Sequence, residues 1–264
     1  MTRVCIAGAT GWTGPAIARG VLEASDLELV SAVARASAGR DLGEALGSEP
    51  LGVPVQASVA EALDGVDVLV DYTSATAVKP NALTAIEAGV GVVIGTSGLT
   101  ADDFAEIDAA ARERSVGVVS SGNFSLTAAM CQAGALLAAR HLQHWEIVDY
   151  AGATKPDVPS GTARELAEKL GDVRRPELGH PIEDLHGPQE ARGATVAGTQ
   201  VHSVRVPSFV VSTEVVFGLP GERLTIRHDA GSTPEPYVAG TLIAVRRVGS
   251  LVGLTRGLDT LLLG

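Results

Sequence analysis

The strongest indication of the fold is the stretch Arg3-Val4-Cys5-Ile6-Ala7-Gly8-Ala9-Thr10-Gly11-Trp12-Thr13-Gly14-Pro15. An apolar run leads into a Gly-x-x-Gly-x-x-Gly turn, and the proline after it favours the first turn of a helix. Glycine lets the backbone turn sharply and approach a pyrophosphate, while the amides at the start of the helix favour an anion. The stretch therefore predicts a strand, a turn and a helix at a dinucleotide, and the alternative is a purely structural turn. The residues expected at the cofactor are Gly8, Thr10, Gly11, Trp12 and Thr13.

The rest of the first half repeats this alternation of strands and helices. Short runs rich in Val, Ile and Leu indicate strands over residues 3–8, 27–34, 67–73, 90–95 and 116–121. Helical patterns fill the gaps at residues 15–23, 58–63, 78–88 and 101–114. Such runs are typical of strands buried on both faces of a parallel sheet. The first half therefore predicts an α/β fold, a Rossmann-like doubly wound parallel sheet, with residues 1–122 as a dinucleotide-binding domain.

The pattern changes after about residue 122. The next expected elements are a helix over 126–139, a strand over 145–150, a helix from 163 and a Gly- and Pro-rich loop over 171–198. The strands that follow indicate an antiparallel meander and cover residues 200–206, 210–217 and 223–228. We expect residues 123–234 to form an α+β domain with a mixed or antiparallel sheet, for substrate binding and oligomerisation. A C-terminal helix within residues 235–264 is expected to pack back on the first domain.

Composition and charge narrow the classes of function. The chain has 264 residues, of which 45% are hydrophobic, so it can bury a substantial core. Its net charge of −11 argues against a nucleic-acid surface, since binding a polyanion requires clustered Lys and Arg. The apolar runs are too short for a membrane span, and the start of the chain leads directly into a strand, so we expect a cytoplasmic protein. The two cysteines and the spacing of the histidines predict neither a disulfide framework nor a metal site.

The end of the second predicted strand bears on the choice of cofactor. An NAD site usually places Asp or Glu there to accept from the ribose hydroxyl, whereas this chain has Ala34-Arg35 with Arg40 nearby. An arginine pairs with a 2′-phosphate in bidentate geometry. We therefore expect NADPH as the cofactor, held in part by Arg35, with NADH as a second possibility. The alternative is a solvated surface arginine.

A second anion site is expected near residue 160. The pattern Thr162-x-x-Glu165 is typical of a capping box that opens a helix. The first turn of a helix has unpaired amides and a partial positive charge, so it binds carboxylate or phosphate. Lys155, five residues before Ser160, adds a full charge, and the alternative is an ordinary capped surface helix with a solvated lysine. The expected substrate-binding residues are Ser160, Gly161 and Thr162.

Five strings, in order along nearly the whole chain, are together similar to the dihydrodipicolinate reductase family. They are the glycine loop, Asp71-Tyr72-Thr73, Gly95-Thr96-Ser97-Gly98, Asn123-Phe124-Ser125 and Lys155-Pro156-Asp157-Val158-Pro159-Ser160-Gly161-Thr162-Ala163. The resemblance implies a homotetramer with a Rossmann-like nucleotide domain and a mixed sheet that forms subunit contacts. It also implies hydride transfer from a nicotinamide to a cyclic imine dicarboxylate. The residues implied at the dinucleotide are Tyr72, Thr73, Gly95, Thr96, Ser97, Ser121, Asn123 and Phe124.

The chain departs from the family at the catalytic residues. Members of the family carry a Glu-x-His-His-x-x-Lys pattern, and the resemblance places Ala151 and Gly152 where the two histidines belong. Neither residue can carry a proton, so another proton donor or a different substrate is required. Lys155 is the first candidate, since an ammonium can protonate a developing amine. Tyr150 is the second, although strand alternation places it on the face opposite Ala151, and the alternative is a packed core tyrosine.

Other polar residues have weaker claims. His202 and His228 fall in predicted strands, where we expect satisfied sheet or interface histidines. Asp149 is expected to be a solvated group at the end of a strand. These three residues are therefore not assigned to a site.

Three functions remain open. The first is an NADPH-dependent imine reductase of the dihydrodipicolinate reductase type, acting on a C=N or conjugated C=C bond of a small carboxylate other than the usual substrate. The second is the authentic 4-hydroxy-tetrahydrodipicolinate reductase of lysine and diaminopimelate synthesis, an amino-acid biosynthetic enzyme. The third is a catalytically inactive, NADPH-binding regulatory protein, against which the intact Lys155 and its anion turn argue.

Overall fold

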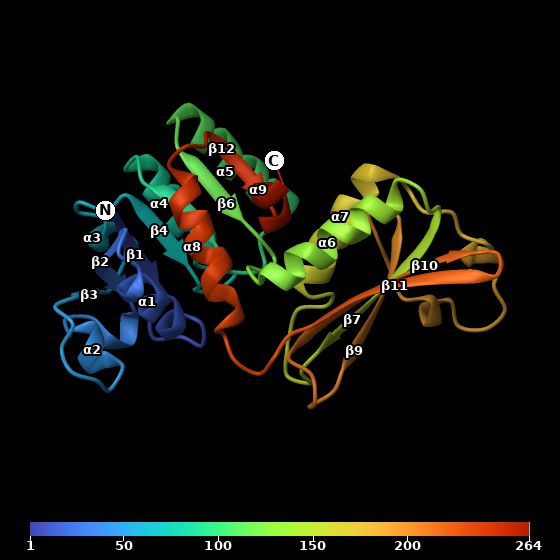
Figure 1. The fold of residues 1–264 in the computed structure, drawn as a ribbon, viewed down its shortest axis with the longest axis horizontal. Coiled ribbons are helices and arrows are strands. Elements are labelled where there is room, and N and C mark those ends of the chain that lie inside the picture. Colours follow the sequence, from blue (N-terminus) through green and yellow to red (C-terminus); the bar gives the residue numbers. More distant parts are fainter. Residues whose placement is uncertain (264) are drawn as a thin grey trace. The chain divides into compact units, whose positions relative to one another are not determined.

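The computed structural model describes residues 1–263 and shows a chain that divides into two compact units. The first unit joins Met1–Leu126 to Thr233–Gly264, and the second unit is Thr127–Ser232. Figure 1 labels the helices and strands of both units. Among the described residues, every helix is too short or too polar to cross a membrane.

The first unit is built on a sheet of seven strands whose neighbours all run parallel. The spatial order is β12-β6-β5-β4-β1-β2-β3, so the winding reverses between β1 and β4. Ligands of such sheets bind outside the carboxyl ends of the strands at this reversal. The predicted Rossmann-like sheet is confirmed. The strands are β1 (Thr2–Ala7), β2 (Leu27–Val33), β3 (Val55–Gln56), β4 (Val68–Asp71), β5 (Gly91–Ile94), β6 (Gly117–Ser120) and β12 (Gly253–Arg256).

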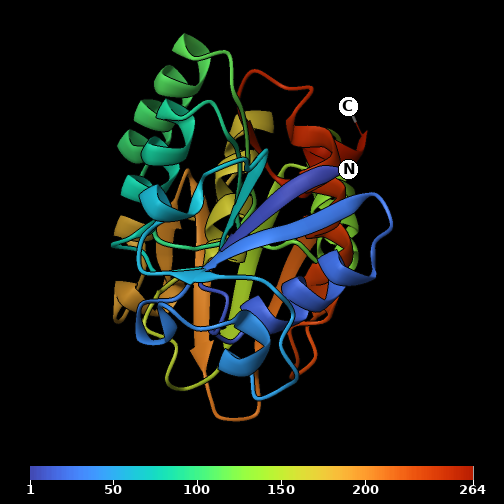
Figure 2. The same cartoon turned by 90° about the vertical axis from the view of Figure 1, so that its left-hand side faces the viewer.

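Helices cover both faces of this sheet, as the view in Figure 2 shows. On one face α1 (Gly14–Glu23) packs against α8 (Pro236–Val248), and α8 also contacts β5 and β6. The other face carries α3 (Val59–Ala62), α4 (Val78–Glu87) and α5 (Ala101–Glu113). The remaining helices are the 3-10 turn η1 (Arg35–Ser37), α2 (Leu42–Ala45) and α9 (Leu258–Leu263).

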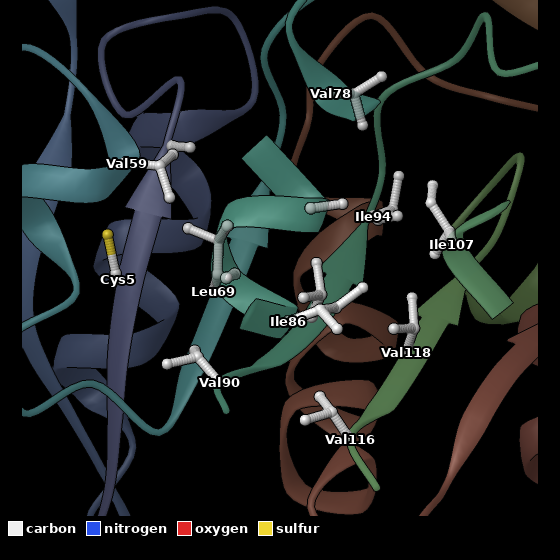
Figure 3. Packing of buried hydrophobic residues seen from close by; sticks show 14 of the residues in the cluster. Cys5, Val59, Leu69, Val78, Ile86, Val90, Ile94, Ile107, Val116 and Val118 are labelled. Atoms are coloured by element: carbon white, nitrogen blue, oxygen red, sulfur yellow. The ribbon is translucent and has the colours of Figure 1, made fainter. Parts of the chain in front are cut away.

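Apolar side chains fill the layer between the sheet and helices α3 to α5. Cys5, Leu69 and Ile94 come from three strands of the sheet and are buried together with Ile86 and Ile107 from the helices (Figure 3). Each fully buried Leu or Ile contributes about 1.5–3 kcal/mol. Because the central strands are covered on both faces, all residues of β4, β5 and β6 are buried. This packing fixes the carboxyl ends of the strands.

The last thirty residues differ from the sequence prediction. Helix α8 ends at Val248, and β12 then pairs parallel with β6 before α9 begins. The helical stretch expected over residues 235–248 is present as α8, but the prediction that the helix alone closes the chain is wrong, because β12 and α9 follow it. Gly253 starts β12 with φ +82°, a conformation that suits glycine and breaks a helix, and Leu254 then lies in register with Val118.

The second unit is built on a mixed sheet with the order β11-β10-β7-β9-β8. Strand β7 (His144–Ala151) is central, pairing antiparallel with β10 (Val211–Leu219) and parallel with β9 (Thr199–Arg205). The expected meander is therefore wrong for β9, because β7 lies between β9 and β10. The mixed sheet itself is confirmed. The edge strands are β8 (Ala194–Val196) and β11 (Glu222–Asp229).

Two helices cover one face of this mixed sheet. Helices α6 (Leu126–Ala139) and α7 (Gly161–Val173) pack on it through Ala135, Leu166 and Leu170, and Figure 1 shows both beside the strands. Residues of β7 alternate strictly, so every second side chain points toward the helices and the others toward the opposite face. Toward the helices, Trp145 contacts Phe217 with ring centroids 5.7 Å apart. The loop between α7 and β8 contains only the 3-10 turns η2 (Ile182–Asp184) and η3 (Gln189–Arg192).

Candidate functional site

The glycine loop after β1 is shaped by close backbone contacts. Gly8 has φ +83°, and a Cβ built on it would lie 2.2 Å from the carbonyl oxygen of Tyr72. A Cβ on Gly14 would lie 2.3 Å from the carbonyl oxygen of Gly8. Helix α1 begins at Gly14, and the residue before it, Thr13, makes no capping hydrogen bond through its side chain. Pro15 has no N–H, and the amides of Ala16 and Ile17 donate to the carbonyl of Thr13 at 3.1 and 3.2 Å. The Gly14 amide and the positive end of the helix dipole therefore remain for an anion.

The ligand-facing part of this loop is exposed. The amide of Gly11 donates to the carbonyl of Gly8 at 2.9 Å, which closes a tight turn. Thr10, Gly11 and Trp12 are exposed, and the indole of Trp12 contacts the ring of Tyr237 with centroids 6.0 Å apart. The structure therefore brings the expected cofactor residues of this loop together on one accessible turn.

A buried carboxylate, to which the sequence analysis assigned no role, organises the neighbouring strand ends. Asp71 at the end of β4 is fully buried. One of its oxygens accepts the Thr73 amide at 3.0 Å, the Thr73 hydroxyl at 2.7 Å and the Thr96 hydroxyl at 2.6 Å. Its other oxygen accepts Asn81 Nδ2 at 2.8 Å. The hydroxyls of Thr73 and Thr96 are therefore committed to Asp71, and these residues shape the loop ends that face the glycine loop.

Aromatic rings fill the space behind these loops. The Tyr72 hydroxyl bonds to Thr241 Oγ1 at 2.8 Å, and burial raises the pKa of Tyr72, so its phenol is neutral. Its ring meets Phe124 edge-on at 6.3 Å, and Phe124 is buried. A Cβ on Gly95 would lie 2.1 Å from Cε1 of Tyr72. These residues therefore pack the inner side of the expected dinucleotide site, and the Tyr72 hydroxyl is committed to the core.

The loop after β6 is tied by its own hydrogen bonds. Ser121 Oγ donates to the carbonyl of Asn123 at 2.9 Å, and Asn123 Oδ1 accepts the amide of Ser125 at 2.9 Å. Ser97, on the loop after β5, is exposed. The residues that the resemblance implied at the dinucleotide thus all lie on loops after β4, β5 and β6, at one edge of the sheet.

One cation lies at the end of β2. Arg35 begins the η1 turn one residue after β2 and is exposed, and within residues 1–263 it forms no salt bridge. Arg40 differs, because its Nη2 donates to the carbonyl of Glu44 at 2.8 Å. The uncapped start of α1, the tight glycine turn and Arg35 together fit a phosphorylated dinucleotide.

A second buried carboxylate organises the anion turn of the second unit. Asp149 in β7 is fully buried, so the expected solvated strand-end group is wrong. Its oxygens accept the amide of Ser160 at 2.9 Å and the hydroxyl of Ser160 at 2.6 Å. Ser160 in turn caps α7, its Oγ accepting the amide of Ala163 at 3.3 Å. The expected capping box at Thr162 is therefore wrong: Ser160 is the cap, because Asp149 fixes it there, and Glu165 instead accepts from Gln132 Nε2 at 3.0 Å.

Arg205 connects the Asp149 carboxylate to the loop that precedes α7. Its Nη2 donates to Asp149 at 2.8 Å and to the carbonyl of Asp157 at 2.9 Å. Lys155 Nζ lies 2.8 Å from Asp157 Oδ1, and the lysine side chain is 27% exposed. Ser203 also donates to Asp149 at 3.0 Å. The structure therefore brings Lys155 and the start of α7 into one network of alternating charge.

Sequence reasoning missed Arg205 and Ser203. Their one signal is that polar residues occupy alternate positions at the end of a strand that begins with buried residues. A strand face that turns from apolar to polar indicates buried partners. Asp149 lies 56 residues before Arg205, so local patterns do not reveal the pair.

Tyr150 lies apart from this network. It is on the face of the sheet opposite Asp149, where its ring meets Phe209 at 4.9 Å and Arg227 lies 4.9 Å above its centroid. The structure therefore separates Tyr150 from the anion turn by the thickness of the sheet. The same face holds His202, whose Nε2 lies 2.7 Å from Glu146, so the expected satisfied histidine is confirmed there.

Both units of the chain are similar to known proteins. Residues 2–124 match the family described as "Dihydrodipicolinate reductase, N-terminus", and residues 124–262 match its C-terminus. The 4-hydroxy-tetrahydrodipicolinate reductase of Moorella thermoacetica is 40% identical over 263 residues, covering 98% of this chain and 97% of the relative. That of Thermosynechococcus vestitus is 35% identical over 266 residues, covering 98% and 96%. The dipicolinate-bound dihydrodipicolinate reductase from Paenisporosarcina sp. TG-14 superposes with a TM-score of 0.75 at 28% identity, covering 98% of both chains.

These matches extend over both units and include the glycine loop and the string from Lys155 to Ala163. The matches confirm the resemblance to the dihydrodipicolinate reductase family that the five sequence strings indicate. They also confirm that the cofactor is a nicotinamide dinucleotide. The chain belongs to the dihydrodipicolinate reductase family and is an NAD(P)H-dependent oxidoreductase.

Proposed function

We propose that this chain is an NADPH-preferring reductase of a C=N bond, or a conjugated C=C bond, in a small carboxylate bound at the start of α7. The observation that carries the proposal is the intact anion turn, in which Asp149 holds Ser160 as the cap of α7 and Lys155 pairs with Asp157 in the same network. A capped helix start with an adjacent cation is suited to a carboxylate. The domain roles follow: the first unit binds the dinucleotide and the second unit binds the substrate.

The residues of the first unit fit the cofactor. The glycine loop and the start of α1 would bind the pyrophosphate, and Arg35 would bind the 2′-phosphate of NADPH, with NADH as the weaker cofactor. The loop residues Thr10, Trp12, Ser97 and Asn123 would line the dinucleotide. When bound, the nicotinamide supplies a hydride to the carbon of the C=N bond.

Lys155 is the proton donor in this proposal. As the imine carbon gains the hydride, the electron pair of the C=N bond moves to nitrogen, which must take a proton to give the amine. Lys155 Nζ carries three N–H groups and is partly exposed beside Asp157, so it can give one proton and regain it from solvent. Tyr150 is not part of the proposed catalytic group, because it lies on the other face of the sheet.

The residues around Ala151 and Gly152, the two positions where the family carries histidines, leave little space for larger side chains. Ala151 is fully buried, and a Cβ on Gly152 would lie 3.2 Å from the carbonyl oxygen of Phe209. The amide of Val206 also bonds to the carbonyl of Ala151 at 3.2 Å, so the loop between β9 and β10 closes over these two positions. This fit to small residues favours a substrate that differs from the usual one. The 40% identity to a 4-hydroxy-tetrahydrodipicolinate reductase favours the authentic reaction as the second candidate.

A turnover assay separates these candidates. The consumption of NADPH is measured with 4-hydroxy-tetrahydrodipicolinate and with cyclic imines that carry one carboxylate. We expect NADPH oxidation with at least one of these substrates, and a higher kcat/KM for the dicarboxylate identifies the authentic enzyme. NADPH binding by calorimetry without turnover of any imine would contradict the proposal and would instead support the inactive regulatory protein.

The assembly and location of the protein are part of the same proposal. The face of the mixed sheet opposite α6 and α7 carries a cavity of about 510 Å³, lined in part by Glu146, Arg192 and His202. A sheet face without covering helices supports contact with other subunits, and we expect a homotetramer, measured by light scattering. We also propose a cytoplasmic location, which fits the relatives' name as reductases of a small dicarboxylate.

A further inference from the structure

A row of polar side chains crosses the helix-covered face of the mixed sheet. Asp149 in β7 lies in register with Thr213 in β10, and Thr213 lies in register with His228 in β11. Residues that face each other in this way share one side of the sheet. The next row toward the other end of the sheet is apolar and consists of Ile147, Val215 and Ile226.

Two members of this row carry buried polar atoms without a partner. Among the described residues, Thr213 Oγ1 and His228 Nδ1 are buried and make no hydrogen bond. Thr213 is 2% exposed and His228 is 8% exposed. The expectation of a satisfied sheet histidine is therefore wrong for Nδ1 of His228, and the alternative of an interface histidine stays a prediction. Leaving a buried polar group unpaired is costly, so a pair of them on one face indicates a bound group.

The row adjoins the anion turn. Asp149, which holds Ser160 at the start of α7, is the third member of the row. Ala151 lies two residues further along β7 on the same face of the sheet, and Thr213 is its diagonal neighbour on β10. Arg205 lies in register with Ala151 on the β9 side and is already engaged by Asp149, whereas Thr213 on the β10 side and His228 beyond it carry polar atoms without a partner.

We propose that Thr213 and His228 bind an acceptor oxygen of the substrate, at the end remote from the oxygen atoms held by α7. This assignment rests on the proposed reductase function. A threonine hydroxyl and a neutral imidazole N–H both donate, and their direct opposition in the β10–β11 ladder lets them converge on one oxygen. Burial lowers the pKa of His228, which keeps its ring neutral and limits it to hydrogen bonding. The two residues thereby determine substrate specificity, and Lys155 remains the proton donor.

Two nearly isosteric apolar variants test this assignment in the full-length protein. Thr213→Val and His228→Phe remove the donors while filling the same space. We expect each variant to raise the KM for the imine substrate and the calorimetric Kd for dipicolinate about tenfold, corresponding to one hydrogen bond of about 1.4 kcal/mol. The Kd for NADPH should not change. Because the lost groups are unpaired in the free protein, the melting temperature should hold or rise by about 2–4 °C.

Controls make the result decisive. Thr213→Ser keeps the hydroxyl and should recover most of the lost dipicolinate affinity, and Thr225→Val on the exposed part of β11 should bind dipicolinate as the wild type does. An unchanged KM and Kd in both apolar variants, with a wild type that binds dipicolinate and turns over an imine, would overturn this assignment alone. A wild type that neither binds dipicolinate nor oxidises NADPH with any imine would overturn the proposed function together with it.

Discussion

Each unit places a buried aspartate at the edge of its site, but the two aspartates are held differently. Within residues 1–263, Asp71 in the first unit accepts hydrogen bonds only from neutral donors, and these lie within 25 residues of it. Asp149 in the second unit pairs with the cation of Arg205, 56 residues later. The first site thus depends on local loop geometry and backbone, whereas the second depends on charges that the sheet brings together. We therefore expect single substitutions in the second unit to have the larger effects on turnover.

The largest expected effect is on Lys155. Lys155→Ala should lower kcat by a factor of about 10²–10⁴, the usual contribution of a positioned proton donor, while the Kd for NADPH stays the same. Steady-state kinetics and cofactor titration measure the two quantities. An equal loss of both would show that Lys155 holds the fold of the second unit and is not a catalytic group.

Lys155→Arg separates proton donation from charge. The guanidinium keeps the positive charge near Asp157 but does not give up a proton in proteins. We expect kcat to stay low while the KM for the carboxylate substrate recovers. If Lys155→Arg instead kept the kcat of the wild type, Lys155 would serve only to contact the anion and would not donate the proton.

The two buried aspartates offer a matched test of the comparison. Asp149→Asn leaves the guanidinium of Arg205, which is 15% exposed, without its carboxylate. Removing one partner of a buried ion pair costs about 3–5 kcal/mol. Asp71→Asn loses hydrogen bonds from hydroxyls but leaves no charge unpaired, so about 1–2 kcal/mol is expected. Urea unfolding of both variants measures the difference, and equal losses would break the contrast between the two units.

The same pair of variants should differ in function. Asp149→Asn releases Ser160 from the start of α7, so kcat/KM should fall while NADPH still binds. Asp71→Asn loosens the loops after β4 and β5, so the affinity for NADPH should fall first. Substrate kinetics and cofactor titration of each variant distinguish these outcomes, and a loss of NADPH affinity in Asp149→Asn would count against the assignment of roles.

A smaller effect is expected at Arg35. Arg35→Ala should weaken NADPH binding about tenfold or more, the value of a hydrogen bond between charged groups, and should leave NADH nearly unchanged. Arg40→Ala is the control, because Arg40 already donates to the carbonyl of Glu44. Fluorescence titration with both cofactors gives the ratio. An unchanged preference would assign the 2′-phosphate to another residue.

The first unit could be predicted from sequence because its features are local. The run from Arg3 to Pro15 contains strand, turn and helix start in thirteen consecutive residues, and the structure forms each of them. Strand β12 was missed because nothing near Gly253 signals a strand, and it forms by pairing with β6, more than one hundred residues earlier. Tertiary pairing of this kind has no local pattern.

The second unit shows the limit of sequence patterns more clearly. Ser160 and Thr162 are both good cap residues, and only the position of Asp149 in the folded sheet selects Ser160. The order of the strands also depends on the folded sheet. Strand β7 lies between β9 and β10, although only a short loop connects β9 to β10 in the sequence. The string around Lys155 located the anion turn, but Arg205 and Thr213, and the position of His228 opposite Thr213, became visible only when the strands were paired.

The smallest expected effect concerns acid stability in the first unit. Asp103 closes the capping box of α5 by accepting the amide of Thr100 at 2.9 Å, and it also pairs with Lys79 at 2.9 Å. These contacts, the Thr100 amide first, lower the pKa of Asp103 from 3.8 to about 2. A carboxyl with a depressed folded pKa stabilises the protein fully above its unfolded value and loses that contribution as the pH falls through the folded value.

Asp103→Asn should therefore unfold at lower urea than the wild type above about pH 4, and the two midpoints should converge as the pH falls toward 2. Asp102→Asn removes the same charge one residue earlier, outside the capping box, and serves as the control. Because Asp103 lies at the surface, water and salt screen its interactions, and the shift should be smaller than that of either buried aspartate. A parallel pH dependence in the wild type and Asp103→Asn would mean that a different carboxyl controls acid unfolding. In that case buried carboxylates such as Asp71 and Asp149 become the groups to test, and the contrast between the two units would extend to their acid stability.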